Sequence, residues 1–99
     1  MKVFLSHKMS GLPEHDVYCI RTEAYEYLTE KYGNCIAIVD NYHHDDAPPN
    51  AGRLWHLGKS IQMLDNVDAI YFVKGHWLNA KGCLVERFIA RVYGLKILK

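Results

Sequence analysis

The sequence has little of what marks a membrane protein or a nucleic-acid-binding domain. Its 99 residues carry a formal net charge of only +1 and contain no block of like charge, so duplex nucleic acid is not an expected partner. No apolar run approaches the roughly 20 residues that span a bilayer. The N-terminus also lacks the apolar core of a signal peptide. We therefore expect a cytoplasmic protein with no membrane partner.

Cysteine is also scarce. The three cysteines, Cys19, Cys35 and Cys83, are widely spaced and form no CxxC pair. An odd, scattered set favours reduced, mostly buried thiols over a disulfide framework.

What the sequence does contain is an alternation of apolar runs and helical patterns. Apolar runs predict strands, and apolar residues at helical spacing predict helices. The predicted strands cover residues 2–6, 35–40, 68–73 and 95–99, and the predicted helices cover about 13–31, 53–64 and 83–93. This order is typical of one α/β domain over residues 1–99, with a parallel sheet and helices on both faces.

The apolar residues also predict how some elements are covered. The run 35–40 is continuous, as in a strand covered on both faces. The helix at 53–64 is expected to turn four leucine and isoleucine side chains to its inner face: Leu54, Leu57, Ile61 and Leu64. The helix at 83–93 gathers an apolar stripe: Leu84, Val85, Phe88, Ile89 and Val92.

Three polar loops follow the predicted strands, at residues 6–12, 41–52 and 74–82. Right-handed crossovers place such loops on one edge of a parallel sheet, where ligands of open α/β proteins bind. We therefore expect a small-molecule site at this edge.

The first loop has the residue types of an anion site before a helix N-terminus: Ser6, His7, Lys8, Ser10 and Gly11. It has neither the GxxxxGK[ST] phosphate loop nor the GxGxxG dinucleotide pattern, which disfavours a classical ATPase or NAD enzyme. We expect no cofactor. An ordinary β–α turn is an equally good interpretation of this loop.

Glu86 is the only acid between residues 81 and 99, where all other charges are positive. On a helical wheel it lies away from the apolar stripe. An acid near a helix N-terminus is favoured by the helix dipole, so a structural role is the simpler interpretation. The dipole would also keep the carboxylate ionised, as a nucleophile requires.

The other two loops offer weaker candidates. His43, His44, Asp45 and Asp46 include metal-ligand types, but adjacent loop residues seldom converge on one ion, and we expect a solvated loop without a metal. In that loop Tyr42 is a candidate for touching a ligand. Trp77 suits stacking on a planar base, or equally a core or subunit contact.

Taken together, these residues resemble a known family. The segments are "FLSHKMSGLP" near the start and "VDAIYFVKGHWLNAKGCLVERFIARVYGLKI" near the end. The second contains the spacing Gly82, Glu86, Ala90 and Gly94. In this combination the chain resembles the nucleoside 2-deoxyribosyltransferase-like superfamily, in its short phage and bacterial branch.

The resemblance implies a flavodoxin-like three-layer sandwich with a small parallel sheet of four or five strands. It implies cleavage or transfer at the N-glycosidic bond of a (deoxy)nucleoside or nucleoside 5′-monophosphate, with Glu86 as nucleophile. It also implies a homo-oligomer, dimer or tetramer. The expected substrate contacts are Ser6, His7, Lys8, Ser10, Gly11, Tyr42, Ser60, Gly75, His76, Trp77, Asn79, Lys81 and Gly82.

The chain departs from the family pattern at three places. His7-Lys8 replaces a usual Gly-Pro, Ser60 stands where many members have aspartate, and Ala80 stands where serine or aspartate is usual. Loss of two polar contacts keeps an alternative open, namely a catalytically idle module that binds or senses a nucleotide. Asp65 and Asp68 lie at the opposite edge, where a structural role is expected.

Overall fold

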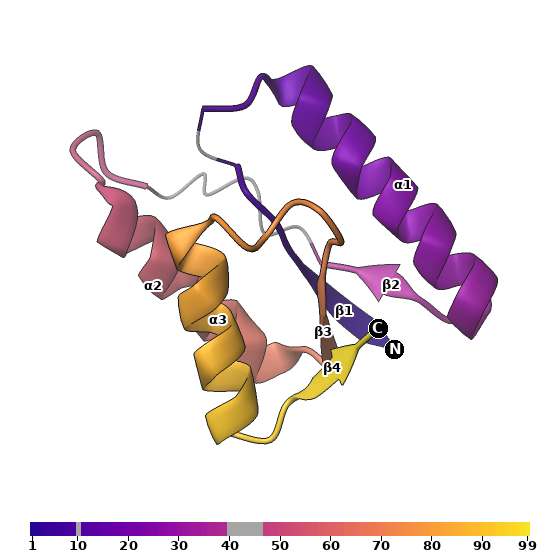
Figure 1. The fold of residues 1–99 in the computed structure, drawn as a ribbon. Coiled ribbons are helices and arrows are strands. Elements are labelled where there is room, and N and C mark those ends of the chain that lie inside the picture. The colour runs from indigo at the N-terminus through magenta and orange to yellow at the C-terminus, as the bar shows by residue number, and fades with distance from the viewer. Residues whose placement is uncertain (10, 40–46) are drawn as a thin grey trace.

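The computed structural model describes residues 1–9, 11–39 and 47–99, which form three layers (Figure 1). The strands are β1 (Lys2–Ser6), β2 (Ala37–Ile38), β3 (Ala69–Phe72) and β4 (Lys96–Leu98). The helices are α1 (Glu14–Tyr32), α2 (Arg53–Met63) and α3 (Lys81–Val92), with a 3₁₀ turn, η1 (Leu64–Asn66), before β3. All strand pairs are parallel, in the order β2-β1-β3-β4. The predicted α/β class and flavodoxin-like topology are confirmed.

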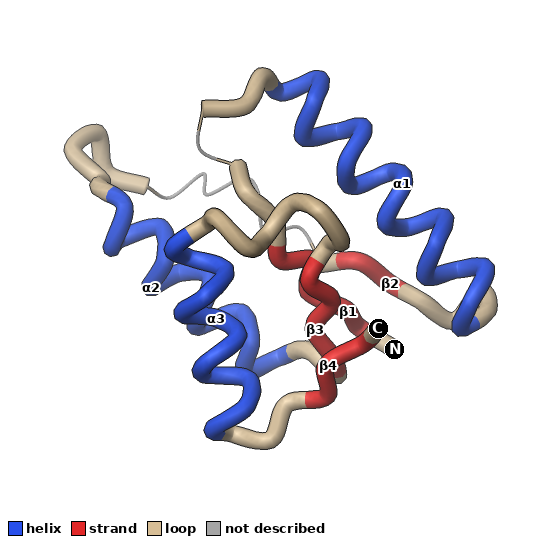
Figure 2. Tube along the Cα trace, viewed as in Figure 1, coloured by secondary structure: helices blue, strands red, loops and turns tan. Residues whose placement is uncertain are grey.

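The sheet lies between α1 on one face and α2 and α3 on the other (Figure 2), and it separates two apolar cores. Successive residues of a strand point to opposite faces. Val3 and Leu5 of β1 therefore pack with Ala24 and Leu28 of α1 on one face. On the other face, Phe4, Ile70 and Phe72 join Leu64, Cys83 and Ala90 from the α2 and α3 side. Ser6 lies two positions after Phe4 in β1, so its side chain points to the same face as that of Phe4, toward α3.

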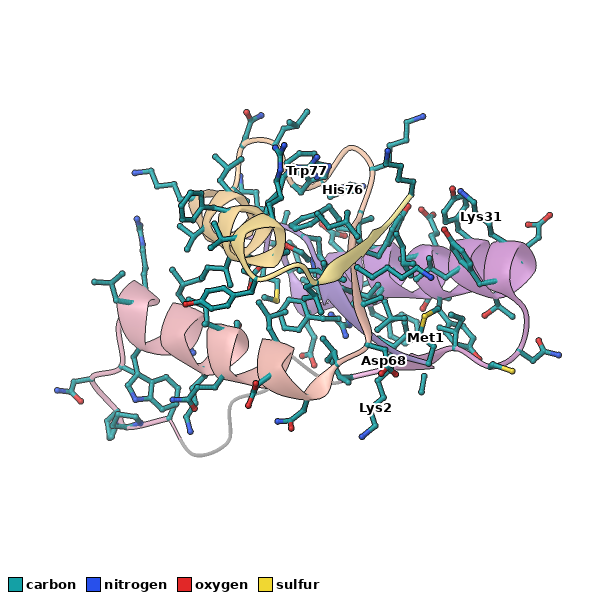
Figure 3. The ribbon with its side chains drawn as sticks, turned by 90° about the horizontal axis from the view of Figure 1, so that it is seen from below. Met1, Lys2, Lys31, Asp68, His76 and Trp77 are labelled. Carbon is teal, nitrogen blue, oxygen red and sulfur yellow. The ribbon has the colours of Figure 1, made fainter. Side chains whose placement is uncertain are left out.

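The parallel register brings the strand ends together. Ser6 pairs with Phe72, so β1 and β3 end side by side, and the loops that follow both strands begin at the same edge. The Lys8 amide donates to the His76 carbonyl oxygen at 2.6 Å and joins these two loops. At the opposite edge, Asp68 Oδ2 accepts a 2.7 Å hydrogen bond from the Lys2 amide (Figure 3), which confirms a structural role for Asp68.

Two predictions about β2 and the cysteines are wrong. Of the described residues 35–39 of the predicted strand, only Ala37–Ile38 form β2, which is an edge strand beside β1. Cover is incomplete, because Ala37 is exposed, while Ile38 and Val39 pack against the two cores. Cys19 and Cys35 are exposed, and only Cys83 is buried; all three thiols are free. Cys19 lies on the outer side of α1, and Cys35 precedes the short edge strand, so neither position is covered.

The helix faces also differ from the prediction. Leu54 is not on the inner face of α2, because its side chain is 82% exposed at the first turn, and Leu64 lies in η1 rather than in the helix. In α3 the buried residues are Cys83, Glu86 and Ala90, while most of the apolar stripe points outward. Cys83 and Ala90 join the apolar core on this face of the sheet.

Within the described ranges, none of the helices has the length and apolar character needed to cross a membrane.

Candidate functional site

A buried hydrogen bond between Ser6 and Glu86 lies where β1 meets α3. Ser6 Oγ donates to Glu86 Oε1 at 2.7 Å, across 80 positions of sequence. Ser6 is 1% exposed and Glu86 6% exposed. Ser6 is the last residue of β1, and Glu86 is on the inward side of α3 with Cys83 and Ala90. The fold thus places the one acid of residues 81–99 against the carboxyl end of a central strand.

Burial sets the protonation of Glu86. Removal of the carboxylate from water raises the pKa of Glu86 to about 7, and the hydrogen bond from Ser6 lowers it in part. The expectation that the helix dipole keeps this group ionised is wrong, because Glu86 is the sixth residue of α3, beyond the first turn where the dipole acts. Near neutral pH, Glu86 therefore exchanges between carboxylate and carboxylic acid.

Cys83 borders the same pair, and burial favours the protonated form of its thiol. Burial raises the pKa of the Cys83 thiol to about 11; a hydrogen bond with Ser6 lowers it, and the charge of Glu86 raises it. A thiol with this pKa stays protonated at neutral pH, and the thiolate is the reactive form.

His7 points to the other side of the sheet, toward α1. Arg21 Nη1 lies 3.2 Å from His7 Nε2, and His7 Nδ1 lies 3.1 Å from the Lys8 carbonyl oxygen. Arginine can only donate, so Nε2 accepts and Nδ1–H donates to Lys8. Burial, followed by the charges of Arg21 and His76, lowers the pKa of His7, against the Lys8 hydrogen bond that raises it. The neutral His7 imidazole therefore links the first loop to α1 through these two hydrogen bonds. A contact between His7 and a substrate stays a prediction.

Arg21, which donates to His7, makes a second contact with the backbone, and sequence reasoning did not identify it. Its Nη2 donates to the carbonyl oxygen of Val39 at 3.0 Å, which ties the end of the β2 segment to α1. From the sequence alone, an arginine that makes such contacts looks the same as an arginine exposed on the surface of a helix.

Eight further loop residues expected to bind a substrate divide into two groups, those that are exposed and those that lie outside the described residues. Lys8, Gly75, His76, Asn79 and Lys81 are exposed beside the carboxyl edge, together with Gly11. The amides of Lys8 and Leu12 donate to His76 and Met9 carbonyl oxygens and so are engaged within the protein. Ser10 and Tyr42 lie outside the described residues, as do His43, His44, Asp45 and Asp46, for which a solvated loop without a metal is predicted. Elsewhere in the described chain, no group of three metal-ligand side chains comes together.

Trp77 packs on the core rather than standing free. Its ring is 5.3 Å from that of Phe72, and the Arg87 guanidinium lies 4.8 Å from its centroid and 5.4 Å from that of Phe72. In this cation–π arrangement the guanidinium covers the indole ring beside α3. The sequence predicted an aromatic position here but gave no sign of Arg87 as its partner.

The comparison with protein families supplies the assignment. A family model described as "Domain of unknown function (DUF4406)" matches residues 1–99, the whole chain. The chain belongs to the DUF4406 family. Neither a curated protein nor a solved structure matches it.

Three further positions of this DUF4406 chain lie near the pair on the α2 and α3 side of the sheet. Ser60 of α2 is 5% exposed and buried on the side of the sheet that carries Glu86. Ala80 is the N-cap residue of α3 and offers no polar side chain. Gly82, where an added Cβ would lie 3.7 Å from Leu57 Cδ1, marks the contact between α2 and the start of α3. Among the described residues of the site, the buried carboxylate is that of Glu86, and the buried hydroxyl that donates to it is that of Ser6.

The Ser6 hydroxyl is expected to tune Glu86 in the DUF4406 chain. In a Ser6→Ala variant the carboxylate loses its donor, and the pKa of Glu86 should rise further above about 7. The carboxyl carbon of Glu86, followed by NMR during a pH titration, reports this shift directly. A Ser60→Ala variant is the matched control. An unchanged or lower pKa of Glu86 in Ser6→Ala would show that this hydrogen bond does not stabilise the carboxylate.

Proposed function

We propose that this protein cleaves or transfers at the N-glycosidic bond of a (deoxy)nucleoside or nucleoside 5′-monophosphate, with Glu86 as the nucleophile. The observation that carries the proposal is the buried Ser6–Glu86 pair at the carboxyl edge of a parallel sheet. A carboxylate with a pKa raised by burial and a single specific partner is a common mark of a functional site.

The location of the pair supports a small-molecule substrate. Parallel α/β sheets bind ligands outside the carboxyl ends of their strands. Ser6 ends β1, and the β3–α3 loop, with exposed His76, Asn79 and Lys81, begins beside it. Lys8 and Lys81 would supply positive charge for a 5′-phosphate.

The chemistry requires one carboxylate at the anomeric carbon. In the ionised state, a Glu86 oxygen attacks C1′; the C1′–N bond breaks, and its electron pair leaves with the base, which takes up a proton from water. The transition state resembles an oxocarbenium ion, which a nearby carboxylate stabilises. Water then attacks C1′ of the glycosyl ester to release the sugar and free Glu86, or a second base does so in a transfer.

The resemblance to nucleoside 2-deoxyribosyltransferase-like proteins agrees with this role. It rests on the spacing of Gly82, Glu86, Ala90 and Gly94, and the helix that carries this spacing buries Glu86 and Ala90 against the sheet. Ala90 is fully buried on the same side of α3 as Glu86, whose carboxylate accepts the hydrogen bond from Ser6.

A second candidate is a catalytically idle module that binds or senses a nucleotide. The absence of a polar side chain at Ala80 and of a carboxylate at Ser60 favours it, since the usual family pattern has polar contacts at both places. The 6% exposure of Glu86 favours it as well, because a nucleophile must reach its substrate. Tight nucleotide binding without release of base would distinguish this candidate from the enzyme.

The experiment is a panel of nucleosides and 5′-monophosphates, with free base separated by chromatography. The parent protein is expected to release base from at least one member, and Glu86→Ala is expected to release none above background. Glu23→Ala is the matched control, because Glu23 is an exposed glutamate of α1 on the other face of the sheet. Equal release by the parent and Glu86→Ala would rule out Glu86 as the nucleophile.

A further inference from the structure

The last residue of β1 and the residue after it are held from opposite faces of the sheet. Ser6 Oγ donates to Glu86 Oε1 of α3 at 2.7 Å. On the other face, His7 Nε2 accepts from Arg21 Nη1 of α1 at 3.2 Å. Both residues are buried, with Ser6 1% and His7 3% exposed. Because the two residues are consecutive, a rotation of the backbone that displaces one side chain also displaces the other.

Arg21 links the segments that follow two neighbouring strands. Its Nη1 donates to His7, directly after β1, and its Nη2 donates to the Val39 carbonyl oxygen at 3.0 Å, directly after β2. The Lys8 amide in turn donates to the carbonyl oxygen of His76, in the loop after β3, at 2.6 Å. A guanidinium is planar and holds its donors in a fixed fork. Arg21 therefore fixes the carboxyl end of β1 relative to that of β2.

We propose that Arg21 is a positioning residue for the reaction at Glu86, because it holds His7 and Val39 together and so keeps the Ser6 hydroxyl directed at the carboxylate. This inference rests on the proposed function. Arg21 belongs to α1 and Glu86 to α3, on opposite faces of the sheet (Figure 2). Arg21 acts only through His7 and Ser6.

The link between Arg21 and His7 requires a neutral imidazole. Arginine only donates, so His7 Nε2 accepts while Nδ1–H donates to the Lys8 carbonyl oxygen. The charged groups that face His7 are Arg21 from α1 and His76 from the β3–α3 loop. Burial and then these two charges lower the pKa of His7, against the Lys8 hydrogen bond that raises it. Near and above neutral pH, the link is therefore intact.

Glu86 is the group whose titration reports the position of Ser6. Burial raises the pKa of Glu86 to about 7, and the hydrogen bond from Ser6 lowers it in part. The Cys83 thiol beside the pair stays protonated at neutral pH, because burial raises its pKa to about 11. If Ser6 moves away, the carboxylate loses its donor and the pKa of Glu86 rises. Removal of Arg21 should therefore change this pKa from the opposite face of the sheet.

The first test measures the pKa of Glu86 by NMR in a double-mutant cycle of Arg21→Met and Ser6→Ala. Each single variant is expected to raise the pKa, and the double variant should raise it no further than Ser6→Ala does. Loss of the Arg21 charge alone would raise the pKa equally with and without the Ser6 hydroxyl, so the cycle separates position from charge. An unchanged pKa of Glu86 in Arg21→Met, or effects that add in the double variant, would overturn the proposal.

The second test is kcat/KM for base release as a function of pH. Loss of a hydrogen bond to a charged group changes an equilibrium about ten-fold or more. Arg21→Met should therefore lower kcat/KM about five-fold near pH 7 and leave it almost unchanged near pH 9, where Glu86 is ionised in both proteins. A residue needed only for folding would lower the rate alike at both pH values, and that result would contradict a positioning role.

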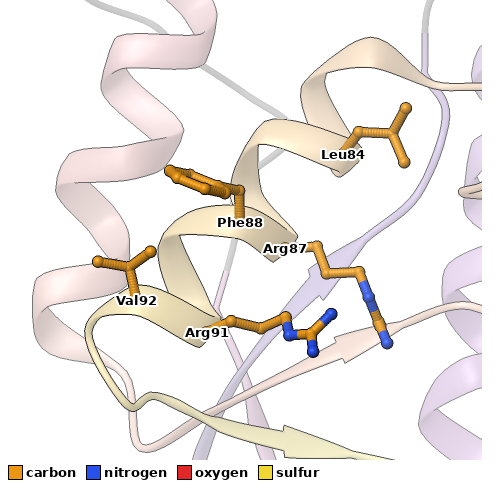
Figure 4. Close-up of a pocket in the computed structure, with 5 residues that line it drawn as sticks. All are labelled: Leu84, Arg87, Phe88, Arg91 and Val92. Atoms are coloured by element: carbon orange, nitrogen blue, oxygen red, sulfur yellow. The ribbon is translucent and has the colours of Figure 1, made fainter.

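The two tests separate this inference from the proposed function. A parent protein that releases no base would refute the glycosidase, while the titration of Glu86 would still decide whether Arg21 holds Ser6 in place. Arg91→Met is the matched control, because Arg91 is an exposed arginine in the last turn of α3, where it lines a shallow groove along the helix (Figure 4). It should change neither the pKa of Glu86 nor kcat/KM.

Circular dichroism checks that each variant is folded. If Arg21→Met does not fold, Arg21→Lys takes its place in both tests. Lysine keeps the positive charge but has one nitrogen instead of the fork, so it cannot hold His7 and Val39 in the same geometry. The pKa of Glu86 is again expected to rise, and an unchanged pKa in Arg21→Lys together with an unchanged rate near pH 7 would overturn the proposal.

Discussion

Glu86→Gln is expected to stabilise the folded protein by about 3 kcal/mol above pH 7 and to leave its stability unchanged near pH 4. The pKa of Glu86 rises from an ordinary 4.5 to about 7 in the folded state. Between these values the folded chain holds a proton that the unfolded chain has lost, so the free energy of unfolding falls as pH rises. Glutamine keeps the shape and the hydrogen bond from Ser6 without the charge.

Urea denaturation of parent and variant at about pH 4 and about pH 8 measures this difference. His7 also makes stability depend on pH. Burial lowers its pKa in the folded state, so the free energy of unfolding decreases as pH falls below 6.5. This effect is the same in both proteins and cancels in their difference. Glu23→Gln, at an exposed position of α1, should change stability little at either pH. A difference between parent and Glu86→Gln that does not depend on pH would mean that the carboxyl group is not desolvated.

The rate of base release should rise by about 50-fold between about pH 5 and about pH 7, and then level off. Only the ionised carboxylate of Glu86 can attack C1′. With a pKa of about 7, roughly one molecule in a hundred is ionised at the lower pH and half at the upper. The measurement is kcat/KM for the best substrate of the panel, because this ratio reports groups of the free enzyme.

Glu86→Gln, run at each pH, supplies the background rate, which matters because acid also breaks N-glycosidic bonds. A parent rate that increases toward low pH after this subtraction would contradict an ionised nucleophile. Ser6→Ala adds a second check, since a further rise in the pKa of Glu86 should move the whole profile to higher pH.

How far sequence reasoning reached differs between residues of the site. Glu86 was identified because a lone acid in a basic segment is visible in the sequence, and the edge of the sheet followed from the order of the elements. Its protonation was predicted wrongly, because a position one turn into a helix indicates the dipole but not the desolvation. His7 in the first loop and Arg21 in α1 are 14 positions apart in the sequence, and no local sequence pattern predicts a contact between them.

The sequence by itself determined the order of strands and helices, the parallel sheet and the edge that carries the loops. Those features follow from local periodicity and from the handedness of the connections, which any chain of this pattern shares. Only the tertiary structure decided which side of α3 faces the sheet. Apolar periodicity predicts that a side chain will be covered, but not by what. In the folded protein Cys83, Glu86 and Ala90 are the buried residues of α3, and the bulkier Leu84, Phe88 and Val92 are left exposed.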